Sequence, residues 1–419
     1  MTGIGALTGL IIGIILIIRK FNPAYSLMFA AVCGGLIGGL ELNVVVAQMF
    51  DGVRDMAPAI VRILAAGVLA GALVQTGSAE KIADSIIRGL GQKNVLPALI
   101  LAVFLLAVAG VFIDVAVITT APVALAVGTK VNLSRNAVLL AMIGGGKAGN
   151  VISPNPNTIM AAEKFGADLS SVMFANWLPA LVGIGFTFLL AWMISKRGEL
   201  LTENSAIPEH DLSESPKNLP NLFAALLGPV VTLILLALRP LAGISVDPFI
   251  ALPAGGLVCV AATLNFSKFK SSLDYGLSKM SGVAILLVGT GTLAGIIKSS
   301  TLKDMIQDML NLTNLPEVTL APISGALMSA ATASTTAGAT VAAVSFSDAI
   351  MAAGITAVAG AAMVNAGATV FDHLPHGSFF HATGGSVQMS LKNRLKLIPF
   401  ETAIGFILAL TSLLANVMF

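Results

Sequence analysis

The chain alternates between long apolar runs and short polar segments. Ten apolar runs approach or reach the length of a transmembrane helix: residues 3–18, 24–40, 57–75, 136–164, 174–194, 221–238, 247–264, 280–298, 354–371 and 397–417. Two further apolar stretches, 95–128 and 316–352, are interrupted near the middle by polar residues. The pattern predicts an all-α polytopic membrane protein with about ten spans.

Each interrupted stretch fits one long helix, two spans or a re-entrant hairpin. With hairpins and the N-terminus outside, 16 of the 23 Lys and Arg residues lie inside and five outside, as the positive-inside rule requires. If either stretch were a single span, all later loops would lie on the opposite side of the membrane, and the excess of Lys and Arg inside would be lost. Two ordinary spans give the same sides as a hairpin, so that alternative stays open. We predict re-entrant hairpins at 95–128 and 316–352, and both termini outside.

Composition agrees with a membrane protein. Only 11% of the residues are charged and 56% are hydrophobic, whereas a soluble domain carries about 25% charged residues. Mean hydropathy is +0.92. These values exclude a soluble enzyme, a nucleic-acid-binding protein and a disordered scaffold. The expected surroundings are the lipid bilayer of the inner membrane, crossed several times.

The two halves of the chain resemble each other in the order of their features. The polar segment 196–220 is rich in Glu, Ser and Pro and is typical of a cytoplasmic linker. Leu69-Ala70-Gly71 before it reappears as Leu293-Ala294-Gly295 after it. Residues 1–195 and 221–419 each hold five predicted spans and one hairpin. Because five is odd, the second half starts from the opposite side, which predicts an inverted-topology repeat.

Run 136–164 is interrupted by Gly144–Gly146, Pro154 and Pro156. Glycine loosens a helix and proline removes a backbone donor, so a discontinuous helix is expected here. An unwound segment at membrane depth lines a wet cavity or is buried in protein. The alternative is an extramembrane loop between two short helices. The polar residues of this segment are candidate substrate ligands: Lys147, Asn150, Ser153, Asn155, Asn157 and Thr158. Lys147 either pairs with a substrate carboxylate, or has a structural partner such as Asp114, or reaches water.

A second discontinuous helix is predicted over residues 354–381, where Asn365, Thr369 and Ser378 are further candidate substrate ligands. Three of the four histidines lie here, close to Asp372. Histidine changes its charge near neutral pH, so Asp372, His373 and His376 are candidates for proton coupling, and His373 also for substrate binding. A metal site and a plain polar loop are the alternatives, but the spacing matches no zinc signature.

The polar interruptions of the two hairpins are the third group of candidates. Asp114 is flanked by apolar residues, and a charge at that depth is costly unless it is paired or hydrated. We consider it a proton-coupling residue or a structural hydrogen-bond acceptor. Ser334, Thr335 and Thr336 hold the matching place in the second half and are candidate substrate ligands or simply small packing residues. Two hairpin tips and two broken helices are expected to meet at mid-membrane.

At the two broken helices the sequence resembles the gluconate permease family, proton symporters of sugar acids within the wider ion-transporter superfamily. Gly144–Gly146 leading to Pro154-Asn155-Pro156-Asn157 matches the first-half pattern of that family. His373 and the run Gly377-Ser378-Phe379 match the second-half pattern, with Pro375-His376 in place of an Asn-Asp pair. The resemblance implies hairpins, inverted repeats, a homodimer and proton-driven uptake of a carboxylate.

The leading hypothesis is therefore a secondary transporter that imports a small organic acid anion by proton symport with alternating access. No Walker-type phosphate-binding motif is present, so an ion gradient is the expected energy source, and no cofactor is expected. Sodium is the alternative coupling ion, held by amide and carbonyl oxygens. A cation/proton antiporter without an organic substrate is a second class. A membrane-embedded enzyme is the least favoured, because charged residues in the spans are few and scattered.

Overall fold

The computed structural model describes residues 1–201, 219–302, 304–305, 308 and 316–418. This part of the chain is helical, and no β-strand occurs in it. The segment 202–218, which makes up most of the predicted linker, lies outside the described residues. The start of the linker is held by a backbone bridge between Ser134 and Leu200 and by an ion pair between Arg135 and Glu199.

Most predicted apolar runs coincide with helices. The uninterrupted ones are α1 (Gly3–Ile18), α2 (Pro23–Ile37), α4 (Ala57–Gln75), α11 (Trp177–Met193), α12 (Leu222–Ala242), α13 (Pro248–Ala262), α14 (Phe269–Lys298) and α21 (Ile398–Met418). Shorter helices are α3 (Leu42–Arg54), α5 (Ser78–Leu90), α10 (Leu169–Ala175) and α20 (Leu391–Leu395). The sequence pattern missed α3, and α14 begins well before the predicted residue 280.

Each of the four interrupted segments forms two helices. These pairs are α6 (Val95–Val108) with α7 (Ile113–Lys130), α8 (Arg135–Asn150) with α9 (Pro156–Phe165), α16 (Leu320–Thr332) with α17 (Thr335–Ala352), and α18 (Ala357–Gly367) with α19 (Ser378–Ser386). A short 3₁₀ helix precedes α6 at Gln92–Asn94 and α16 at Glu317–Thr319. The discontinuous helices are thus present, whereas the re-entry of α6–α7 and α16–α17 into the membrane stays a prediction.

Five helices of the described chain are long and apolar enough to cross a membrane, and the pair α10 and α11, bent by 42°, would be a sixth. Further apolar helices of 10–17 residues, among them α1, α2, α6, α13 and α18, are shorter than this criterion. The structure therefore establishes a helical protein with several helices that are long and apolar enough to span a membrane. The number of about ten spans and the inverted repeat stay predictions.

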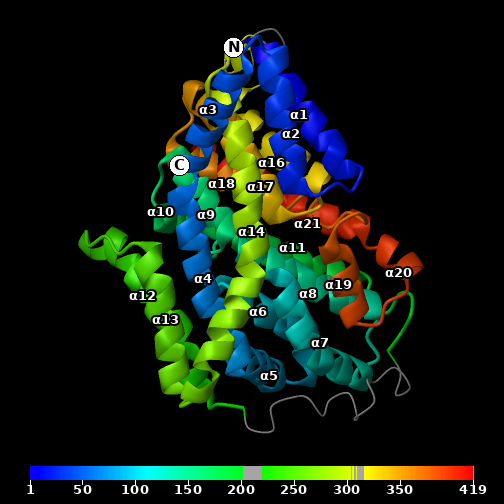
Figure 1. The fold of residues 1–419 in the computed structure, drawn as a ribbon. Helices are drawn as coiled ribbons and strands as arrows, with labels where there is room; N and C mark the ends of the chain where they lie inside the picture. Colours follow the sequence, from blue (N-terminus) through cyan, green and yellow to red (C-terminus); the bar gives the residue numbers. More distant parts are fainter. Residues whose placement is uncertain (202–218, 303, 306–307, 309–315, 419) are drawn as a thin grey trace.

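Helix α14 runs through the middle of the molecule and organises the packing around it (Figure 1). α12 and α13 lie on one flank of the view and α19 and α20 on the other. α14 packs closely against α3 and α4 because glycine faces backbone at both contacts. A Cβ on Gly295 would lie 1.9 Å from the Gln48 carbonyl oxygen, and one on Gly71 would lie 2.0 Å from that of Ser272.

Candidate functional site

A cavity of ≈280 Å³ lies where several helix ends meet α14. Seven of the candidate residues from the sequence line it: Asp114, Asn150, Ser334, Thr335, Thr336, Asp372 and Ser378. Phe112, Ile113, Ala333 and Phe379 from the helix ends and Lys279 and Val283 from α14 complete the lining. The structure therefore brings together the polar interruptions of both predicted hairpins and both broken helices.

Three helix N-termini converge on this cavity. α7 begins at Ile113, α17 at Thr335 and α19 at Ser378, and each of these residues lines it. The first N–H groups of a helix have no intrahelical acceptor and carry a partial positive charge. Only α17 has a side-chain cap, in which Ser334 accepts a hydrogen bond from the Ala337 N–H; α7 and α19 have none. Such an arrangement attracts an anion.

Asn150 supplies a second, independent sign of a ligand site. Its side chain is 94% buried at the end of α8 and lines the cavity. The Asn155 amide nitrogen donates to both the backbone and the side-chain oxygens of Asn150, at 2.7 Å each. This contact leaves the Asn150 Nδ2 donor without a partner in the described structure. A buried amide without an acceptor is costly, so a bound carboxylate or hydroxyl would satisfy it.

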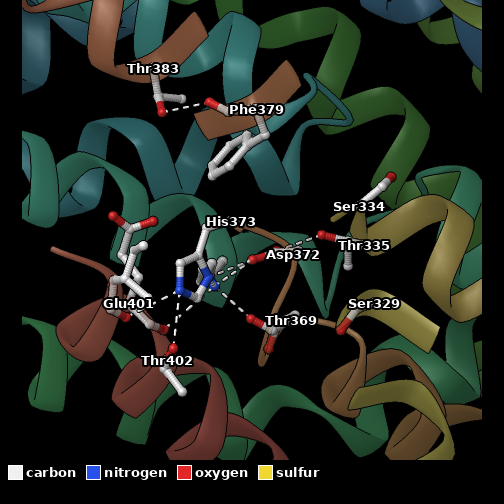
Figure 2. A network of polar contacts seen from close by, with 12 residues as sticks. Ser329, Ser334, Thr335, Thr369, Asp372, His373, Phe379, Thr383, Glu401 and Thr402 are labelled. Carbon is white, nitrogen blue, oxygen red and sulfur yellow. Dashed lines mark hydrogen bonds and ion pairs between the residues drawn. The ribbon is translucent and has the colours of Figure 1, made fainter. Parts of the chain in front are cut away.

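A buried polar network, drawn in Figure 2, adjoins the cavity through Asp372 and Thr335. The Lys147 Nζ lies 2.6 Å from Asp372 Oδ1, 2.5 Å from the Thr369 carbonyl oxygen and 3.1 Å from His373 Nδ1. Thr335 at the start of α17 donates to the other Asp372 oxygen at 2.6 Å. Asp372 thus connects the cavity to a lysine that has no solvent exposure.

His373 contacts both members of this ion pair. Its Nε2 lies 3.2 Å from the Ile398 carbonyl oxygen and 3.1 Å from Thr402 Oγ1. A carbonyl only accepts, so Nε2 is the donor in that contact. The other ring nitrogen, Nδ1, lies 3.1 Å from Lys147 Nζ and 3.2 Å from Asp372 Oδ1. His376 lies apart from this network, with its Nε2 3.3 Å from the Ala331 carbonyl oxygen.

A buried ion pair that the sequence analysis missed lies next to this network. Arg394 is 1% exposed and forms a bidentate pair with Glu401, which has no exposure. The Arg394 guanidinium also stacks on the Phe380 ring, 4.6 Å from its centroid. The sequence analysis counted Arg394 only among the charges expected inside, and the structure shows that its side chain is buried. The signal for the pair was a lone glutamate inside the last apolar run.

The remaining candidates hold the two broken helices together. Asn157 donates to Asn365 Oδ1 at 2.7 Å, and Asn365 donates to Thr158 Oγ1 at 3.1 Å. Asn155 caps α9 by accepting from the Thr158 N–H. These side chains do not line the cavity, and neither does Ser153, whose buried hydroxyl is without a partner in the described structure. They tie the first broken helix to the second.

Two expectations need correction. Gly144–Gly146 do not loosen α8, which runs unbroken to Asn150. Their missing side chains instead permit close packing, since a Cβ on Gly145 would lie 2.2 Å from the Ile100 carbonyl oxygen. Lys147 does not line the cavity, and its partner is Asp372 rather than Asp114. The cation that does line the cavity, Lys279, is placed by the sequence pattern in a cytoplasmic loop.

A separate group of charges ties other elements together. Arg62 on α4 contacts Glu163 on α9 and Asp247 at the start of α13. Hydrogen bonding from Arg62 holds the pKa of Asp247 below its ordinary value. Because each acid here has a cationic partner, this group is a structural tie. No group of three His, Cys, Asp or Glu side chains in the described part is arranged to hold a metal ion.

Comparison with known families decides the family of this chain. The model of the GntP family permeases matches residues 1–419. This chain belongs to the GntP permease family. The predicted resemblance is confirmed, and so is the expectation of a membrane permease rather than an enzyme. An uncharacterized transporter of Haemophilus influenzae is 51% identical, over 99% of this chain and 98% of its own length.

More distant relatives carry functional names. A gluconate permease of Zymomonas mobilis is 23% identical over 90% of this GntP-family chain and 89% of its own. A high-affinity gluconate transporter of Escherichia coli is 23% identical over 89% of both chains. The crystal structure of the Alcanivorax borkumensis YdaH transporter matches with a TM-score of 0.61 at 16% identity, over 90% of this chain and 88% of that one. This last likeness concerns the fold alone.

Proposed function

We propose that this GntP-family permease imports a small hydroxylated organic acid, gluconate or a related sugar acid, by proton symport. The convergence of three helix N-termini on the cavity carries the proposal. A carboxylate bound there accepts hydrogen bonds from the free N–H groups of α7, α17 and α19. The positive helix ends also disfavour a bare cation, so the site fits a carboxylate transporter better than a cation/proton antiporter.

The polar side chains of the cavity suit the hydroxyl groups of the same substrate. Ser334, Thr335, Thr336 and Ser378 offer hydroxyls, and Asn150 offers an amide donor without a partner in the described structure. A site built from such donors and acceptors rejects an analogue that lacks the matching hydroxyls, because its buried polar groups are then left unpaired. The functional names of the gluconate-transporting relatives agree with this substrate class.

A proton gradient fits the site better than a sodium gradient. The amide oxygens that could hold sodium already accept hydrogen bonds. Asn150 accepts from the Asn155 amide, Asn155 accepts from the Thr158 N–H, and Asn365 accepts from the Asn157 amide. Asp114, Asp372, His373 and His376 are the candidates for the coupling proton. Alternating access between inverted repeats and a homodimeric assembly complete the proposal.

Transport assays in proteoliposomes test the substrate class. We expect labelled gluconate to enter when the lumen is alkaline, and uptake to stop when an uncoupler is added. Hexanoate, which has the same chain length but no hydroxyls, should compete poorly. Proton flux triggered by sodium, with no uptake of any acid in a panel of gluconate, glycerate, lactate, citrate and uronates, would make the protein an antiporter.

The substitution Asn150→Asp tests the cavity itself. It keeps the side-chain volume but places a negative charge where the free amide donor lies, so the apparent affinity for gluconate should fall at least tenfold (about 1.4 kcal/mol or more). Asn43→Asp at the exposed start of α3 is the matched control and should transport like the wild type. Unchanged affinity in Asn150→Asp would place the substrate elsewhere.

A further inference from the structure

The titratable residues in the cavity lining are Asp114, Asp372 and Lys279. Asp372 is compensated, because the Lys147 ammonium and the Thr335 hydroxyl both bind its carboxylate. Asp114 is different: within the described structure its carboxylate has no ion pair and no hydrogen bond from a side chain. It sits in the first turn of α7, among the helix ends that would bind a substrate anion.

We propose that Asp114 is the binding site of the coupling proton, which it takes up as the substrate anion enters the cavity. The inference rests on the proposed function and names the coupling residue of that site. Without substrate, the Asp114 carboxylate lies at the positive end of α7. A substrate carboxylate competes for the same N–H groups and places a second negative charge beside the first. Asp114 then binds a proton, and its O–H becomes a donor to the substrate.

The other candidates are less suited to this role. Asp372 would have to lose its pair with Lys147 and leave that lysine buried and uncompensated. His373 contacts both members of that pair and, like His376, does not line the cavity. Lys147, Asp372 and His373 therefore form a fixed wall of the site.

The groups around Asp114 are compatible with reversible protonation of its carboxylate. α14 faces the cavity with Lys279 and places Tyr275 in electrostatic contact with Asp114. Lys279 lies over the Tyr275 ring, 5.5 Å from its centroid. α6 carries no titratable residue, α8 carries Lys147 and, at its far end, Arg135 paired with Glu199, and α19 carries His381, bonded to the Pro375 carbonyl. The charged residues of α5, which also packs on α7, are Glu80, Lys81, Asp84 and Arg88.

Proton and anion binding at one site are reciprocally linked. Raising the pH should therefore lower the apparent affinity for gluconate in the wild type, by as much as about tenfold per pH unit. In Asp114→Asn the side chain at position 114 is neutral at every pH. We expect this variant to exchange internal for external gluconate with a pH-independent affinity, but to lose at least tenfold of the accumulation driven by an alkaline lumen.

The decisive measurements are counterflow and gradient-driven uptake side by side in proteoliposomes. Asp274→Asn removes an exposed carboxylate next to Tyr275 on α14 and is the control expected to keep wild-type coupling. Gradient-driven accumulation by Asp114→Asn, or an unchanged pH slope of its affinity, would overturn the inference. If Asp114→Asn does not fold, Asp114→Glu replaces it in the same measurements. A shifted pH profile of gluconate affinity supports proton binding at residue 114, and an unshifted profile contradicts it. Wild-type protein that exchanges no hydroxy acid would instead refute the proposed function.

Discussion

Lys147 and Asp372 show how a charge is accommodated at membrane depth. The two residues come from different halves of the chain and lie 2.6 Å apart with almost no exposure. Removing both ions from water is expensive, and their attraction and hydrogen bonds offset that cost only when the geometry is good. Thr369, Thr335 and His373 supply those further hydrogen bonds. The pair is therefore a unit in which neither partner is tolerated alone.

This coupling gives the first prediction at the residue scale. Lys147→Met leaves the Asp372 carboxylate buried without its cation, and should lower the stability by about 3–5 kcal/mol. The double variant with Asp372→Asn removes both charges and should recover most of that loss. Thermal unfolding of the detergent-solubilised protein measures the effect, with Lys396→Met, an exposed lysine, as control. Strictly additive losses in the double variant would show that the two residues act independently.

The polar residues of the site are predictable from sequence, but their partners are not. Asp114, Asn150 and Ser334 stand out because a polar residue inside an apolar run is costly unless it is paired, hydrated or bound to a ligand. The pairing of Lys147 with Asp372 joins residues 225 positions apart and depends on tertiary packing. Lys279 was missed because hydropathy ends the predicted span at residue 280, whereas α14 continues to Phe269. The first residues of α14 are mostly polar, so they give no hydropathy signal of a helix.

At the scale of elements, the site depends on helix ends that approach one another closely. The two-residue connection between α16 and α17 places Ala333 in the left-handed region, at φ +46°. Gly377, which precedes α19, packs directly on this connection. The N-termini of α17 and α19 are thereby brought to one cavity. The four breaks, and the expectation that they meet, came from Pro, Gly and polar residues, but the contact of Gly377 with Ala333 was not predictable, because it depends on tertiary packing within the second half.

Gly377→Ala tests this approach. The new Cβ would lie 2.5 Å from the Ala333 carbonyl oxygen and 2.6 Å from its Cβ, so α19 must move away from α17. We expect at least a tenfold loss of gluconate affinity in counterflow, with the protein still folded. Gly385→Ala in the last turn of α19 is the matched control, because nothing lies within 4 Å of its added Cβ. Equal affinities in the two variants would remove the α17–α19 contact from the binding site.

At the scale of the whole molecule, ion pairs between elements agree with the sidedness expected from sequence. Lys298 pairs with Asp55, and both are expected outside. Arg135 pairs with Glu199, and both are expected inside. The order of elements also repeats: the 3₁₀ helix Gln92–Asn94 leads into α6–α7, and Glu317–Thr319 leads into α16–α17. An inverted repeat requires these two corresponding places to face opposite sides of the membrane.

Single cysteines at these two places test the inverted repeat. In a variant without Cys33 and Cys259, we expect Glu317→Cys to react with a membrane-impermeant maleimide in intact cells. Lys93→Cys should react only after the membrane is permeabilised, because positive charge keeps its loop inside. Asn43→Cys is the outside control. Labelling of Lys93→Cys and Glu317→Cys from the same side would contradict the inverted repeat. The two places face opposite sides only if an odd number of membrane crossings separates them. Labelling from the same side would mean an even number, as expected if an interrupted stretch between them crosses the membrane once.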